Sequence, residues 1–227
     1  MSDIDLPFSQ EEYSDRLARV RQAMVEAGVD VMVTVDPSNM AWLTGYDGWS
    51  FYVHQAVIIG PSGDPVFWGR AMDAVGAGRT CYMAADDLVP YPDHYVMSTE
   101  RHPMDHLALL LAERGWADGR VGVEMENYYY SARAHQVLGA ALPGELVDAT
   151  ALINWCRAVK SPAEITFMRR AARIVERMHE VARDMIAPGV RKCDLVAEIT
   201  ATGYRGAEFE GVVFGGDYPA IIPLTPT

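Results

Sequence analysis

The N-terminal part of the chain passes from a helical to a strand-like pattern of apolar positions. Ser9 and Glu12 have the spacing of a capping box, apolar residues then recur at helical spacing, and Gly28 supplies a stop. Residues 29–35 form a short run rich in β-branched side chains, and residues 36–39 follow as a cluster typical of a turn. These patterns predict a helix, a strand and a turn, in that order.

Strands and helices continue to alternate after this turn. Residues 51–59 and 66–68 predict two strands of a hairpin, because a segment rich in Gly and Pro separates them. Pro103 is well placed as the first residue of a helix that ends at Gly115. Three further elements are expected: strands at 120–124 and 145–147, and a helix at 130–142. The alternation indicates an α/β layer arrangement with a largely internal sheet.

A second domain is expected to begin at Ser161. Ser161, Pro162 and Glu164 combine a helix cap, a proline at the first helical position and the acidic partner of a capping box. Two amphipathic helices follow. We therefore assign residues 1–160 to one domain and residues 161–227 to the start of another.

The C-terminal residues have the pattern of a strand that runs into a loop. An apolar strand at a chain end normally pairs with a neighbour. The helices after Ser161 also need a sheet to pack on, and residues 209–214 and 220–224 supply only its first strands. We therefore expect the second domain to be incomplete, with catalytic residues beyond Thr227.

Composition narrows the function classes. A net charge of −12 argues against nucleic acid and against an anionic membrane surface as partners. No apolar run approaches the ~20 residues of a transmembrane helix, and no signal peptide is apparent. Cys81, Cys156 and Cys193 are scattered, which is typical of reduced structural thiols. We expect a soluble, cytoplasmic protein.

The polar residues predict no metal centre. Five candidate ligands have irregular spacings that match no compact site, and we interpret the carboxylates as solvated loop residues: Asp73, Asp86, Asp87, Asp93 and His94. His102 and His106 could share a helix face, but no third ligand accompanies them. A capping role for His102 beside Pro103 is favoured.

An aromatic cluster is the most unusual feature of the first domain. Its five rings are interrupted by glycines, which places them on a loop rather than on a core stripe: Trp42, Tyr46, Trp49, Phe51 and Tyr52. Aromatic faces bind cationic groups, and loops often carry recognition. The same residue types also fill domain or subunit interfaces, so both interpretations stay open.

Two segments resemble a known superfamily. Residues 160–171, followed by Pro-Gly at 188–189, resemble the opening of the pita-bread catalytic domain of creatinases and prolidases. Residues 36–46, with Asn39, an aromatic residue and then Thr-Gly, resemble the N-terminal domain of the same proteins. The resemblance covers essentially the whole chain. It implies an α/β creatinase-like N-terminal domain with a mixed sheet flanked by helices, followed by a truncated α+β pita-bread domain.

Three other segments resemble the ectoine hydrolase branch of this superfamily: residues 47–55, 127–131 and 215–221. That resemblance implies hydrolytic opening of the cyclic amidine of ectoine to acetylated diaminobutyrate. Creatinase-like members cleave C–N bonds without a metal, so no cofactor is expected. Prolidases and aminopeptidases instead use two metals held by Asp, Asp, His, Glu and Glu, and all these positions would lie after Thr227.

The resemblance also implies a homodimer in which the N-terminal domain of one subunit overhangs the active site of the other. We assign four residues to a lid over a small zwitterionic substrate and one to the pocket wall: Trp49, Phe51, Tyr52 and His54, and then Tyr218. Two alternatives remain open: a metal-dependent Xaa-Pro dipeptidase or aminopeptidase, and a non-catalytic dimerisation module.

Overall fold

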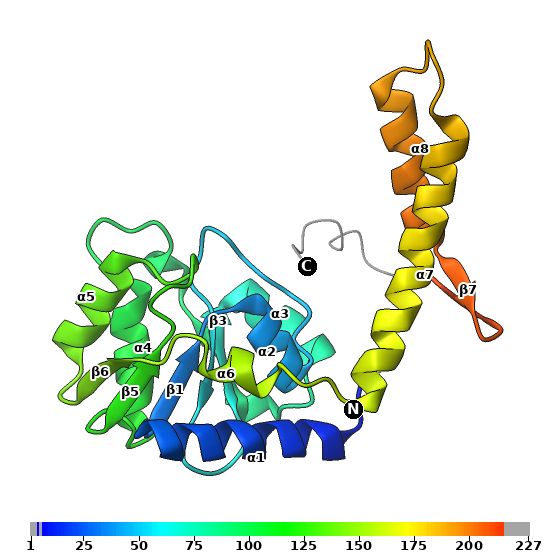
Figure 1. Ribbon diagram of the computed structural model, residues 1–227. Coiled ribbons are helices and arrows are strands. Elements are labelled where there is room, and N and C mark those ends of the chain that lie inside the picture. Colours follow the sequence, from blue (N-terminus) through cyan, green and yellow to red (C-terminus); the bar gives the residue numbers. More distant parts are fainter. Residues whose placement is uncertain (1–3, 5, 216–227) are drawn as a thin grey trace. The chain divides into compact units, whose positions relative to one another are not determined.

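The computed structural model of the chain describes residue 4 and residues 6–215, and it contains two compact units (Figure 1). The first comprises Met1–Val159 and the second Lys160–Thr227. We describe each unit separately.

A six-stranded mixed sheet forms the centre of the first unit, in the order β4-β3-β2-β1-β5-β6. Its strands are β1 (Val31–Thr34), β2 (Ala56–Ile59), β3 (Val66–Arg70), β4 (Leu88–Tyr91), β5 (Arg120–Val123) and β6 (Glu145–Asp148). β2 runs antiparallel to both of its neighbours, and all the other pairings are parallel. The expected hairpin of β2 and β3 is confirmed.

The carboxyl ends of most strands lie at the same edge of this sheet. The carboxyl ends of β1, β3, β4, β5 and β6 meet there, together with the amino end of β2. We call it the carboxyl edge. β2, β3 and β4 follow one another on one side of β1, whereas β5 lies on the other side of β1. The strand order therefore reverses between β1 and β5, which is where open α/β sheets commonly bind ligands.

Helices cover both faces of the sheet (Figure 1). They are α1 (Gln10–Ala27), α2 (Pro37–Thr44), α3 (Ala71–Thr80), α4 (Pro103–Glu113), α5 (Ala132–Ala141) and α6 (Leu152–Cys156). Val31 and Val33 pack with residues of α4 and α5, whereas Met32 packs with residues of α1, α2, α3 and α6. Side chains of a strand alternate between the two faces of the sheet, so β1 contributes to the apolar core on each face.

The turn expected at residues 36–39 is wrong, because these residues begin α2. The carboxylate of Asp36 accepts hydrogen bonds from the backbone N–H groups of Ser38 and Asn39, at 2.8 and 3.1 Å. Pro37 is the first helical residue. Asp followed by Pro suits a turn and a helix start equally well, since both need a side-chain acceptor and a fixed φ.

Gly45 ends α2 in a left-handed conformation, with φ at 81°. A Cβ there would lie 2.8 Å from the carbonyl oxygen of Thr80, so only glycine fits without a shift. The strand expected at residues 51–59 is shortened to β2, and the residues before it form a loop. The sequence did not predict three further elements: α3, β4 and α6.

The second unit contains two helices and a hairpin: α7 (Pro162–Met185), α8 (Lys192–Arg205), β7 (Ala207–Phe209) and β8 (Val212–Phe214). The capping box of Ser161 and Glu164 is confirmed. The single strand expected at 209–214 is wrong, because Glu210 and Gly211 have positive φ angles and turn the chain into the hairpin. Inside this unit the guanidinium of Arg170 lies 4.2 Å from the centre of the Phe214 ring. The strand expected at 220–224 lies outside the described residues.

Candidate functional site

Four loops meet the carboxyl edge of the sheet in the first unit. They precede β2 and follow β4, β5 and β6: residues 45–55, 92–102, 124–131 and 149–151. Loops at this edge are held by the strand ends, so their side chains can be positioned by a rigid scaffold. The described residues assigned to the lid all lie in the first of these loops.

Three of the lid residues and one residue from another loop form a continuous row of rings. Ring centres lie 6.0 Å apart for Tyr129 and Trp49, 5.8 Å for Trp49 and Phe51, and 5.5 Å for Phe51 and Tyr52. We call these four residues the aromatic row. Phe51 is 78% exposed, so its ring face is accessible to a ligand within this unit. Tyr129 was not assigned to the site; its only sequence signal was its place in the segment 127–131.

The other two rings of the expected cluster lie in the core. Trp42 is 6% exposed on α2, and the guanidinium of the buried Arg16 lies 5.1 Å from its ring centre. Tyr46 packs 4.6 Å from Phe67 and donates a 2.7 Å hydrogen bond to Oε1 of Gln55. The interpretation of all five rings as one loop cluster is therefore wrong. Trp42 faces the core because α2 forms where a turn was expected.

His54 lines a pocket of about 170 Å³ beside the aromatic row, together with Tyr52, Tyr91, Tyr95, Arg101 and His102. The rings of His54 and His102 lie 5.1 Å apart. Burial, and secondarily the proximity of His102, lowers the pKa of His54 to about 4. At neutral pH this imidazole is uncharged, so it can serve as a hydrogen-bonding group but not as a fixed cation.

The capping role expected for His102 is confirmed. Its Nδ1 accepts a 3.2 Å hydrogen bond from the backbone N–H of Met104 at the start of α4. Asp105 accepts a hydrogen bond from the backbone N–H of His102, which completes a capping box. His106 instead accepts a hydrogen bond from the indole N–H of Trp68 at 3.1 Å, so the two histidines serve separate structural contacts.

A buried polar network lies where the strand order reverses. Glu124, directly after β5, accepts hydrogen bonds from the hydroxyl of Thr34, the backbone N–H groups of Val35 and Asp36, and the amide of Asn39. Burial raises the pKa of Glu124, although these hydrogen bonds oppose the shift. Arg157 donates a 2.6 Å hydrogen bond to the carbonyl oxygen of the Asn39 side chain. The network joins β1, β5, α2 and the segment after α6.

Two residues of this network, Asp36 and Glu124, line a pocket of about 290 Å³. Its lining also includes Asn127, Tyr128 and Tyr129. Asn127 donates a 3.0 Å hydrogen bond to Asp36. Because Asp36 and Glu124 already accept several hydrogen bonds, we assign them to holding the loops that carry Tyr129 and the start of α2.

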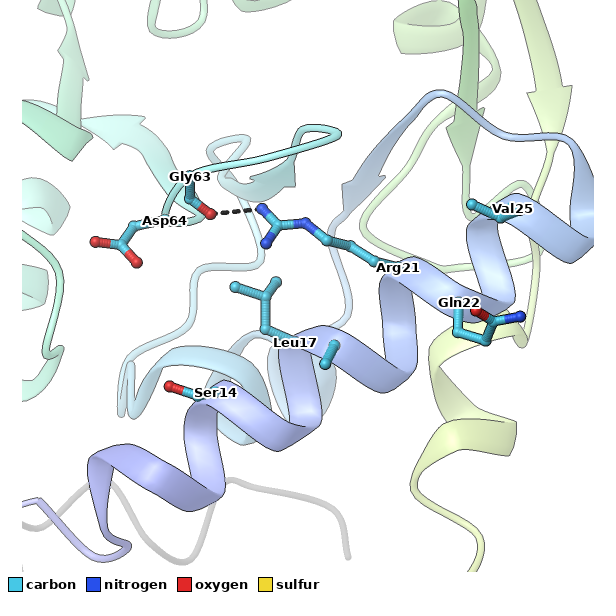
Figure 2. Close-up of a pocket in the computed structure, with 8 residues that line it drawn as sticks. Ser14, Leu17, Arg21, Gln22, Val25, Gly63 and Asp64 are labelled. Carbon is cyan, nitrogen blue, oxygen red and sulfur yellow. Dashed lines mark hydrogen bonds between the residues drawn. The ribbon is translucent and has the colours of Figure 1, made fainter.

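A larger groove of about 620 Å³ lies between α1 and the hairpin loop that joins β2 to β3. Figure 2 shows Arg21 reaching from α1 towards the carbonyl oxygen of Gly63, to which it donates a hydrogen bond. This hairpin loop lies at the sheet edge opposite the carboxyl edge, and the groove is lined by none of the four described residues assigned to the lid.

The scattered acidic residues are not simply solvated loop groups. Asp73 lies half-buried on α3, and burial raises its pKa. Asp87 pairs with Arg114, and Asp93 pairs with Arg70. Among residue 4 and residues 6–215, no three His, Cys, Asp or Glu side chains converge as metal ligands. In the same part of the chain, every helix is too short or too polar to cross a membrane. Tyr218 lies outside the described residues.

Known proteins resemble this chain in both sequence and structure. It is 56% identical to an ectoine hydrolase of Halomonas elongata over 230 residues, covering 100% of this chain and 58% of that protein. It is 25% identical to a creatinase of a Bacillus species, covering 87% of this chain and 46% of that protein. The chain therefore spans about half the length of these curated relatives.

Among solved structures, a Xaa-Pro dipeptidase from Bacillus anthracis superposes with a TM-score of 0.65 at 18% identity, over 84% of this chain and 48% of that one. At this identity the likeness concerns the fold alone. It confirms the expected α/β class, with a mixed sheet flanked by helices. The sequence profile of the creatinase/prolidase N-terminal domain matches residues 16–159. The chain therefore belongs to the creatinase/prolidase family.

Proposed function

We propose that the protein is a hydrolase that opens the cyclic amidine ring of ectoine to give acetylated diaminobutyrate. One observation carries the proposal: the 56% identity to an ectoine hydrolase extends over the whole of this chain, the carboxyl-edge loops included. Identity falls to 42% for an uncharacterised hydrolase/peptidase of Sinorhizobium fredii and to 25% for the creatinase.

The chemistry of the aromatic row suits such a substrate. An amidinium is a flat, delocalised cation, and aromatic faces attract cations by about 0.5–2 kcal/mol each. Phe51 and Tyr52 are exposed, so their faces can receive the ring. A lid of this kind would also exclude water from the reacting centre. We assign Trp49, Phe51 and Tyr52 to substrate binding, and His54 as a neutral hydrogen-bonding neighbour.

The acid–base groups of the reaction are proposed to lie beyond Thr227, in a catalytic domain that begins at residue 161. On this proposal, the 227-residue chain alone has no hydrolase activity. The same proposal includes a cytoplasmic homodimer that works without a metal, in which the aromatic row of one subunit covers the catalytic domain of the other.

The main competing function is that of a metal-dependent Xaa-Pro dipeptidase. It is favoured by the fold shared with the dipeptidases of Bacillus anthracis and Mycobacterium ulcerans, at 18% and 23% identity. The higher identity to the ectoine hydrolase favours ring opening over this alternative.

Activity assays on the complete encoded protein separate the two functions. Ectoine and a Xaa-Pro dipeptide are supplied in parallel, each with and without a metal chelator. We expect ring opening that the chelator does not affect, and no cleavage of the dipeptide. Chelator-sensitive cleavage of the dipeptide without ring opening would overturn the proposal.

A further inference from the structure

Tyr52, the last residue of the aromatic row, contacts an ion pair between Arg70 and Asp93 that has no role in the proposed function. The hydroxyl of Tyr52 accepts a 3.3 Å hydrogen bond from Nη1 of Arg70. Arg70 also donates from Nε and Nη2 to the two carboxylate oxygens of Asp93, at 2.8 and 3.2 Å. All three nitrogens of one guanidinium are thus engaged, two by a carboxylate and the third by the last ring of the row.

Arg70 and Asp93 lie outside the loop of residues 45–55 that carries Tyr52. Arg70 is the last residue of β3, and Asp93 begins the single 3-10 turn that follows β4. β3 and β4 are paired, with Arg70 beside Tyr91, so the two partners are brought together by the sheet. A bidentate guanidinium–carboxylate pair has a defined plane, which directs the remaining nitrogen of Arg70 towards Tyr52.

We infer that Arg70 and Asp93 are positioning residues that hold the aromatic row in place through the hydroxyl of Tyr52. The inference rests on the proposed role of this row in binding the substrate. Tyr52 contacts Phe51, and Phe51 contacts Trp49, so a displaced Tyr52 leaves Phe51 with one ring neighbour instead of two. Phe51 has little contact with the core, and its position therefore depends on these rings.

Asp93→Asn in the complete encoded protein tests the inference. An amide cannot accept both hydrogen bonds of the guanidinium, so Arg70 loses its fixed plane while Tyr52 and Arg70 remain present. We expect KM for ectoine to rise about two- to fivefold, the range that one exposed ion pair supports, with kcat little changed. Hydrogen–deuterium exchange in a peptide that covers residues 49–52 should accelerate by a similar factor, while Tm stays unchanged.

Glu145→Gln is the matched control. Glu145 pairs with Arg120 at 3.2 Å, and its side chain is 66% exposed, against 65% for Asp93. It lies at the start of β6, on the edge opposite the aromatic row. This variant should leave KM and the exchange of residues 49–52 unchanged. An equal effect of both variants would mean that any lost surface charge suffices, and it would overturn the inference.

Tyr52→Phe decides whether the ion pair acts through the hydroxyl. Asp93→Asn combined with Tyr52→Phe should match Tyr52→Phe alone, because the contact is already lost. Additive effects on KM, or unchanged exchange in Asp93→Asn, would overturn the inference. If the wild-type protein does not open ectoine, the proposed function fails, whereas the exchange measurements still test the positioning role.

Discussion

The side-chain amide of Asn39 donates a 2.6 Å hydrogen bond to Oε1 of Glu124, a residue 85 positions further along the chain. The bond connects the start of α2 to the end of β5, at the point where the strand order of the sheet reverses. Asn39 is also the residue that anchors the resemblance to creatinase-type N-terminal domains. Its role in this structure is to hold the first turn of α2 to the end of β5 at the carboxyl edge.

Glu124→Ala should strongly destabilise the first unit. The change leaves three donors without an acceptor, Thr34 and the backbone N–H groups of Val35 and Asp36. It also removes one of the two hydrogen bonds that the Asn39 amide donates, since the other goes to Asn154. We expect the free energy of unfolding to fall by roughly 3–5 kcal/mol, measured by urea denaturation. Glu126→Ala, at an exposed position in the same loop, should change it by less than about 0.5 kcal/mol. Equal losses in both variants would contradict this role for Glu124.

His54 should make stability depend on pH between about 4 and 6.5. Burial lowers its pKa from 6.5 to about 4, so in this window the unfolded chain binds a proton that the folded chain does not. The contribution of neutral His54 to the free energy of unfolding is fully present above pH 6.5. It is lost as the pH falls to about 4, which lowers the free energy of unfolding by on the order of 2–3 kcal/mol. Urea midpoints of the wild type and of His54→Gln across this range measure it. If His54→Gln shows the same dependence of stability on pH as the wild type, the lowered pKa of His54 is contradicted.

The two tryptophans near α2 should respond differently to truncation. Trp42→Ala removes a core side chain and its contact with Arg16, so we expect a loss of about 3–5 kcal/mol in the free energy of unfolding. Trp49→Ala removes a half-buried loop side chain, so it should weaken ectoine turnover more than folding. Denaturation and steady-state kinetics of both variants, each made in the complete encoded protein, check this. Lost stability with an unchanged rate would make Trp49 a packing residue.

The helices whose starting residues form capping contacts within a single turn could be predicted from the sequence. Ser161, Pro162 and Glu164 specify a helix start by themselves, because each contact lies within one turn. The same holds for His102 and Pro103 at the start of α4. By contrast, α3 contains Gly76 and Gly78, which lower intrinsic helix propensity, so its stability comes from packing on β3 and β4.

The candidate site was only partly predictable for a related reason. Composition identified an aromatic segment, but it could not distinguish Trp42, which is buried in the core, from Trp49, which lies in the loop and contacts Phe51. That distinction depends on where α2 ends. Tyr129 and Arg70 follow or end other strands, so only the sheet order brings Tyr129 to Trp49 and Arg70 to Tyr52.

Phe51→Ala in the complete encoded protein tests most directly whether the aromatic row recognises the substrate. The ring is exposed, so its removal should leave Tm unchanged and lower kcat/KM for ectoine about 2- to 30-fold, the equivalent of one cation–π face. Val25→Ala, at a side chain 74% exposed on α1, is the control and should change neither quantity. Unchanged kcat/KM in Phe51→Ala, or a drop that merely follows lost stability, would contradict the account.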